Sequence, residues 1–226
     1  MSKIIEPRQS IPISKEFFCD GHYYVLTSAS LGGSSLKPEE LSDILARSET
    51  QEIEELLRRG ICIPLFFNGD CALDSHTLFV FGDLTEQEEH DWIGRFAGKL
   101  NIPCGKFIIL CGGGDAEELA YAISGNPPKP HYEIFQVIEV PPTDYLVEVY
   151  AYLSSMTVQQ SLEYYDENWN LKENEALRQW YQMNCPGIAD IDYIIRLVPL
   201  ETEPPLPKLV AEIGWCGEFE FRQPEL

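Results

Sequence analysis

Basic residues are scarce in this 226-residue chain: 16 lysines and arginines stand against 37 aspartates and glutamates, a formal net charge of −21. Between residues 107 and 171, Lys129 is the only basic residue, against ten acidic ones. Because such a surface repels phosphates, we expect no direct nucleic-acid binding and no association with an anionic membrane. The charge favours either a well-solvated surface or one that attracts a basic protein partner.

Long apolar runs are also missing. No run approaches the roughly 20 residues that a membrane-spanning helix needs, and the first ten residues hold no apolar segment of a secretory signal. The seven cysteines lie at irregular spacings and form no C-x-x-C pair, which favours reduced thiols in a reducing compartment. These absences predict a soluble, cytoplasmic protein.

Motifs of well-known catalytic sites are absent as well. The sequence contains neither the G-x-x-x-x-G-K-[S/T] phosphate loop nor the G-x-S-x-G nucleophile motif. No group of cysteines and histidines has the spacing of a zinc site. The sequence therefore gives no reason to expect a cofactor.

What the sequence does have is a series of short apolar segments, the clearest of them at residues 77–111. A β-prone run over residues 77–81 precedes Thr85-x-x-Glu88, which fits a helix-capping box. Apolar residues between 92 and 100 recur at helical spacing, and a second apolar run ends the segment. The pattern predicts a strand-helix-strand unit within a subdomain of residues 1–125.

Residues 125–130, Gly-Asn-Pro-Pro-Lys-Pro, are the best candidate boundary, because this composition cannot continue a helix. Residues 131–226 predict a second subdomain, with two hairpins flanking a pair of helices. We therefore predict an α+β fold with mixed, largely antiparallel sheets and helices packed on one face. The two segments are either similar subdomains or parts of one continuous domain.

The loop over residues 68–76 gathers side chains that can bind metals or transfer protons, namely Asp70, Cys71, Asp74 and His76. It lies between two predicted strands, where functional loops are often held. The same composition is typical of an ordinary polar turn. A ligand or metal site here is therefore one of two interpretations.

Cys111 follows a buried strand and precedes Gly-Gly-Gly-Asp115 at the start of a predicted helix. This placement suits a nucleophile or an anion-binding turn. Asp115 and Glu118 favour the simpler interpretation, a helix cap, because their charges repel an anion. We keep Cys111 as a candidate ligand-site residue beside the 68–76 loop.

Aromatic residues are concentrated in the second half of the chain, and four of them are candidate interface residues: Tyr164, Trp169, Trp180 and Tyr181. Tyrosine and tryptophan are favoured anchors of protein interfaces, although they also pack in cores. We therefore favour a non-enzymatic protein-binding or regulatory module that contacts a protein partner, or a second copy of itself as a homo-oligomer. The alternative is an enzyme or a small-ligand or metal-binding protein with a site at the 68–76 loop and the 111–115 turn.

Overall fold

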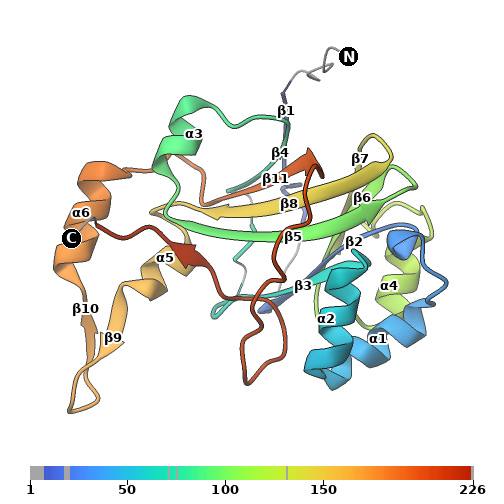
Figure 1. Cartoon of the computed structure of the whole chain (residues 1–226), viewed down its shortest axis with the longest axis horizontal. Helices are drawn as coiled ribbons and strands as arrows, with labels where there is room; N and C mark the ends of the chain where they lie inside the picture. The colour runs from blue at the N-terminus through green and yellow to red at the C-terminus, as the bar shows by residue number, and fades with distance from the viewer. Residues whose placement is uncertain (1–7, 18–20, 71, 75, 131, 225–226) are drawn as a thin grey trace.

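The computed structural model describes residues 8–17, 21–70, 72–74, 76–130 and 132–224. Two β-sheets pack against each other; helices cover the outer side of the smaller sheet and also lie at one end of the pair (Figure 1). The described residues form six α-helices and twelve strands, in one mixed and two antiparallel sheets. The predicted α+β fold is confirmed.

The larger sheet has six strands in the order β1-β4-β11-β8-β5-β12. Neighbouring strands are antiparallel except β4 and β11, which are parallel. Its strands are β1 (Gln9–Pro12), β4 (Thr77–Phe81), β11 (Tyr193–Pro199), β8 (Thr143–Ala151), β5 (Gly94–Ile102) and β12 (Glu220–Phe221).

The second sheet is antiparallel, with the order β3-β2-β6-β7. Its strands are β3 (Cys62–Phe66), β2 (Tyr23–Ser28), β6 (Lys106–Cys111) and β7 (Phe135–Glu139). Central strand β2 reads as a nearly unbroken apolar run because both of its faces are covered. On its outer side lie helices α1 (Pro38–Arg47), α2 (Thr50–Arg58) and α4 (Ala116–Ile123), and the short 3₁₀ helix η1 (Leu31–Gly33) follows β2.

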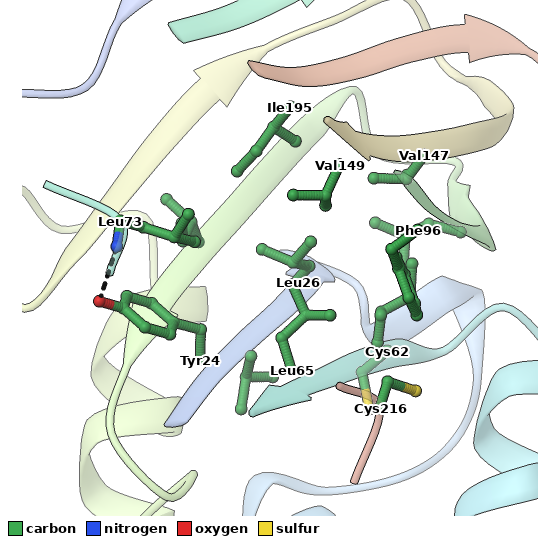
Figure 2. Packing of buried hydrophobic residues seen from close by; sticks show 14 of the residues in the cluster. Tyr24, Leu26, Cys62, Leu65, Leu73, Phe96, Val147, Val149, Ile195 and Cys216 are labelled. Atoms are coloured by element: carbon green, nitrogen blue, oxygen red, sulfur yellow. Dashed lines mark hydrogen bonds between the residues drawn. The ribbon is translucent and has the colours of Figure 1, made fainter. Parts of the chain in front are cut away.

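The main core fills the space between the two sheets. Figure 2 shows Leu26 and Leu65 of the smaller sheet facing Phe96, Val149 and Ile195 of the larger one. All five are at most 3% exposed. Burying such side chains is the main source of stability in a fold of this kind, about 1.5–3 kcal/mol for each.

The remaining elements lie at one end of the sheets. Helix α3 (Glu86–Asp91) follows β4, and α5 (Met156–Ser161) leads into a two-stranded hairpin and then α6 (Glu175–Asn184). The hairpin consists of β9 (Glu163–Tyr165) and β10 (Leu171–Glu173) and projects away from both sheets (Figure 1). Within the described residues, no helix is long and apolar enough to cross a membrane.

The predicted helix over residues 85–100 is wrong in its second half. Thr85 does cap a helix, accepting from the Glu88 backbone N–H, but α3 ends at Asp91. Residues 94–102 form strand β5, whose residues are alternately buried and half-buried. Phe96 and Leu100 fit both helical and strand spacing, and the glycines at 94 and 98 disfavour the helix.

The predicted strand pairings are also wrong. Strands β4 and β6 lie in different sheets, so the two strands of the predicted unit at residues 77–111 are not neighbours. Strands β7 and β8 lie in different sheets too, because the two prolines at 141 and 142 carry the chain across and supply no N–H to a hairpin turn. Between the two helices α5 and α6 stands the β9–β10 hairpin, which was not predicted, and residues 209–222 contribute one two-residue strand in place of the second predicted hairpin.

The expected boundary at residues 125–130 lies between α4 and β7. In both large sheets, strands that precede this boundary pair with strands that follow it. In the larger sheet β4 pairs with β11 and β5 with β8, and in the smaller sheet β6 pairs with β7. Two subdomains and one continuous domain both stay predictions.

Candidate functional site

The β9–β10 hairpin carries most of the large apolar side chains that the described residues leave exposed. Tyr164 is 52% exposed, Tyr165 63%, Trp169 83% and Leu171 53%. The rings of Tyr165 and Trp169 lie 6.2 Å apart. Exposed aromatic side chains gathered on one element are typical of a contact surface rather than of a solvated loop.

A network of hydrogen bonds centred on Asp166 fixes the tip of the hairpin. Its carboxylate accepts from the backbone N–H groups of Asn168 and Asn170, each at 2.9 Å, and from the Asn170 side-chain amide. The bond from the Asn170 backbone is the main cause that lowers the pKa of Asp166 below its ordinary value. The turn holds Trp169 in the left-handed region, at φ 61°, while its N–H donates to the Asp166 carbonyl at 2.9 Å. The turn thereby presents Trp169 on a fixed backbone.

The hairpin is also acidic: residues 163–173 contain four carboxylates and one lysine. The lysine is Lys172, whose Nζ lies 3.7 Å from the Asp166 carboxylate, so Asp166 already balances part of the positive charge. Glu173 contacts Arg178 of α6. The exposed rings therefore stand in a negative field, which favours a positively charged counterpart.

The four predicted interface residues have different surroundings. Tyr164 and Trp169 are exposed on the hairpin, and Trp180 is half-buried on α6. Tyr181 is fully buried, and its hydroxyl donates to the carbonyl of Arg222 at 2.8 Å. Tyr165 and Leu171 are also exposed but were not among the predicted interface residues; the turn-forming run Asp-Glu-Asn-Trp-Asn between them is the sequence signal that marks a hairpin.

A cavity of about 340 Å³ lies at the base of this region. Its walls come from the end of β3, from α5 and from the C-terminal segment around β12. Four phenylalanines and several uncharged polar groups line it, with a single carboxylate: Phe66, Phe67, Phe219, Phe221, Asn68, Gln160 and Glu218 among them. Gln160 and Ser161, the last residues of α5, connect the cavity to the hairpin along the chain.

In the 68–76 loop, local contacts occupy the predicted site residues. Asp70 lies 3.0 Å from Nε2 of His22, whose Nδ1 is 3.0 Å from the Phe67 carbonyl. The Asp74 carboxylate accepts from the backbone N–H of His76 at 2.9 Å. Among the described residues no three histidine, cysteine or acidic side chains are grouped as a metal site, and Cys71 lies outside those residues. A ligand site on this loop stays a prediction.

The loop does approach the 111–115 turn, through a buried tyrosine. The Leu73 backbone N–H donates to the Tyr24 hydroxyl at 3.1 Å (Figure 2), and Tyr24 is paired with Cys111 between β2 and β6.

Cys111 is disulfide-bonded, so the expectation of reduced thiols is wrong at this position, and a disulfide sulfur is not a nucleophilic thiolate. Asp115 caps α4, as predicted, and accepts from the Glu117 N–H at 2.9 Å.

Three carboxylates are buried outside these regions, those of Glu88, Asp91 and Glu148, and Glu148 lies on the outer face of the larger sheet. Glu148 is 2% exposed and accepts from Arg95 and Arg196, with one bond to each at 3.0 Å. Arg196 also donates to the Gly82 carbonyl at 2.7 Å. Because Glu148 already holds both guanidinium groups, the cluster ties β5, β8 and β11 together.

No protein-family model and no curated protein matches this chain. Among solved structures, a protein described as "Crocagin biosynthetic gene J" is similar with a TM-score of 0.37 and 13% identity over 85% of this chain and 95% of its own. ComJ from Bacillus subtilis, an inhibitor of the DNA-degrading activity of NucA, is similar with a TM-score of 0.32 and 9% identity over 86% of this chain and 96% of its own. At these TM-scores neither similarity bears on the function of this chain.

Proposed function

We propose that this chain is a non-enzymatic protein-binding module that contacts its partner through the β9–β10 hairpin. The observation that carries the proposal is Trp169, which is 83% exposed on a turn that Asp166 fixes with several hydrogen bonds. An exposed tryptophan on an ordered turn loses little conformational freedom when a partner covers it.

The neighbouring side chains complete a surface of suitable kind. Tyr165 and Leu171, which are paired across the two strands, add apolar area on the same face as each other, and the Tyr165 ring contacts Trp169; Tyr164 lies on the opposite face of the hairpin. In known interfaces a few buried aromatic residues carry most of the binding free energy, while the polar rim excludes water. The acidic residues of the hairpin are suited to form such a rim.

The partner that best fits this surface is a basic protein. The net charge of −21 and the four carboxylates of the hairpin produce a negative field around the exposed rings. Opposite charge on a partner accelerates association and sets its orientation, whereas an acidic partner is repelled.

The experiment compares three forms of the purified protein as affinity baits: the wild type, Trp169→Ala and Leu206→Ala. Leu206 is 39% exposed but lies outside the hairpin, so its variant controls for the loss of any exposed apolar side chain. We expect a basic protein that the wild type and Leu206→Ala retain equally, and that binds Trp169→Ala about 30-fold more weakly in titrations with the purified partner. The same set of partners and affinities for all three baits would contradict the proposal. If sedimentation shows that the wild type and Leu206→Ala self-associate and that Trp169→Ala does not, the partner is instead a second copy of this chain.

A further inference from the structure

The cavity beside α5 has the composition of a site for one cationic side chain. Phe66, Phe67, Phe219 and Phe221 are among the residues that line it, and the ring centroids of Phe67 and Phe219 lie 6.1 Å apart. Aromatic faces attract ammonium and guanidinium groups through their negative π-electron density. The volume of about 340 Å³ is at the lower end of the range for small-ligand sites, so it accommodates one long side chain and not a folded segment.

Polar groups near the rings match the donors of a guanidinium. Asn68 and Gln160 offer amide oxygens, and Glu218 offers a carboxylate that is exposed to solvent. A planar guanidinium carries five N–H donors and stacks on aromatic rings, which an ammonium group does less well. These residues therefore favour arginine over lysine.

The charge at the cavity is one-sided. None of the ten described residues that line it is basic. Glu218 forms an ion pair with Lys208, whose Nζ lies 4.0 Å from the carboxylate on a side chain that is 84% exposed. A contact this long between exposed groups contributes little and is readily displaced.

We propose that this cavity receives one arginine side chain of the basic partner, with its guanidinium among the phenylalanine rings and against Glu218. The inference rests on the proposed function for the identity of the ligand, but the cavity can be tested alone. Position connects the two surfaces, because Ser161 lines the cavity and Glu163, two residues later, begins the hairpin. A partner segment that crosses the base of the hairpin is therefore close to the cavity.

The test titrates the whole protein with Nα-acetyl-L-arginine amide and follows backbone amide signals by NMR. The matched probe is Nα-acetyl-L-citrulline amide, which has nearly the same shape but no charge. We expect shifts at Phe66, Gln160 and Phe219 with the arginine probe, and at least about fivefold weaker binding of the citrulline probe. Equal binding of both probes, or shifts that avoid these residues, would overturn the inference.

Two variants identify the carboxylate. Glu218→Gln removes the charge at the cavity, whereas Glu220→Gln removes an equally exposed charge on β12 outside the lining residues. We expect Glu218→Gln to weaken the arginine probe about fivefold and Glu220→Gln to leave it within about twofold. If Glu220→Gln has the same effect, the binding reflects net charge and not this cavity.

The Trp169→Ala variant separates this inference from the proposed function. It should retain the arginine probe at wild-type affinity, because Trp169 is not part of the cavity lining. If the protein partner depends on Trp169 but no arginine probe binds, the proposed function stands and the cavity site is refuted. If the probe binds as expected but no partner depends on Trp169, the cavity site stands and the hairpin proposal is refuted.

Discussion

Two groups of aromatic residues in this protein have opposite surroundings. In the core, Tyr24, Tyr152 and Tyr193 are completely buried. The hydroxyl of each has a hydrogen-bond partner: the Leu73 N–H, the Glu88 carbonyl and Thr157, respectively. On the β9–β10 hairpin, the rings of Tyr164, Tyr165 and Trp169 are more than half exposed.

The difference shows that aromatic content alone does not distinguish a core from an exposed surface. Burial raises the pKa of Tyr152 and Tyr193, because water no longer stabilises their phenolate forms. Each buried ring therefore needs both packing and a partner for its hydroxyl, whereas the hairpin rings need neither in the isolated chain. Substitutions in the two groups should consequently affect different properties, the core group stability and the hairpin group binding.

The largest expected effect is that of Tyr24→Ala. Removing this ring leaves a cavity beside Phe67, whose ring centroid lies 5.5 Å away, and deprives the Leu73 N–H of its acceptor. We expect the free energy of unfolding to fall by about 3–5 kcal/mol, as measured by urea denaturation. Tyr164→Ala is the matched variant and should change it by no more than about 0.5 kcal/mol. Similar losses for both variants would remove the distinction between the two groups.

A smaller effect is expected from Tyr193→Phe, which keeps the ring and removes the hydroxyl. That hydroxyl accepts from the Thr157 N–H at 3.0 Å and lies 2.8 Å from the Thr157 side-chain oxygen, so it anchors α5 to β11. We expect a loss of about 1–2 kcal/mol and faster amide exchange in α5, while Tyr164→Phe leaves both unchanged. Unchanged exchange in α5 would show that the hydroxyl does not anchor this helix.

The smallest effect concerns the hairpin tip at low pH. The pKa of Asp166 is lowered, and the hydrogen bond from the Asn170 backbone N–H is the main cause. The ionised carboxylate therefore stabilises the turn. That contribution is complete above the ordinary aspartate pKa of about 3.9 and disappears as pH falls through the lower folded value. Trp169 fluorescence should therefore be constant from about pH 7 to 5 and change only below about pH 4. A midpoint of the fluorescence change above about pH 4, or the same fluorescence change in Asp166→Asn, would contradict the role of Asp166 in stabilising the turn.

Sequence patterns predicted the α+β class and the starts of α3 and α4 at Thr85 and Asp115, since caps and apolar runs are local features. They failed at residues 94–102, because Phe96 and Leu100 fit both the helical and the strand spacing. Packing against the second sheet decides in favour of the strand. They also failed for strand pairing, because the parallel neighbours β4 and β11 are more than 100 residues apart in sequence.

The site was partly predictable for the same reason. Tyr164 and Trp169 were candidates from composition alone, but their exposure depends on a hairpin that the helical pattern concealed. The cavity was not predictable, because its walls come from residues 66–68, 157–161 and 217–221. No pattern within any one of these segments shows that they meet.

The position of β11 has a consequence for the order of folding. This strand is inserted between β4 and β8, so the β1–β4 pair reaches the rest of the larger sheet only through residues 193–199. During synthesis, β1 and β4 therefore emerge long before the strand that joins them to β8. The edge of β4 that pairs with β11 therefore has no native partner until more than 100 further residues have been made, and an unpaired strand edge is prone to aggregation.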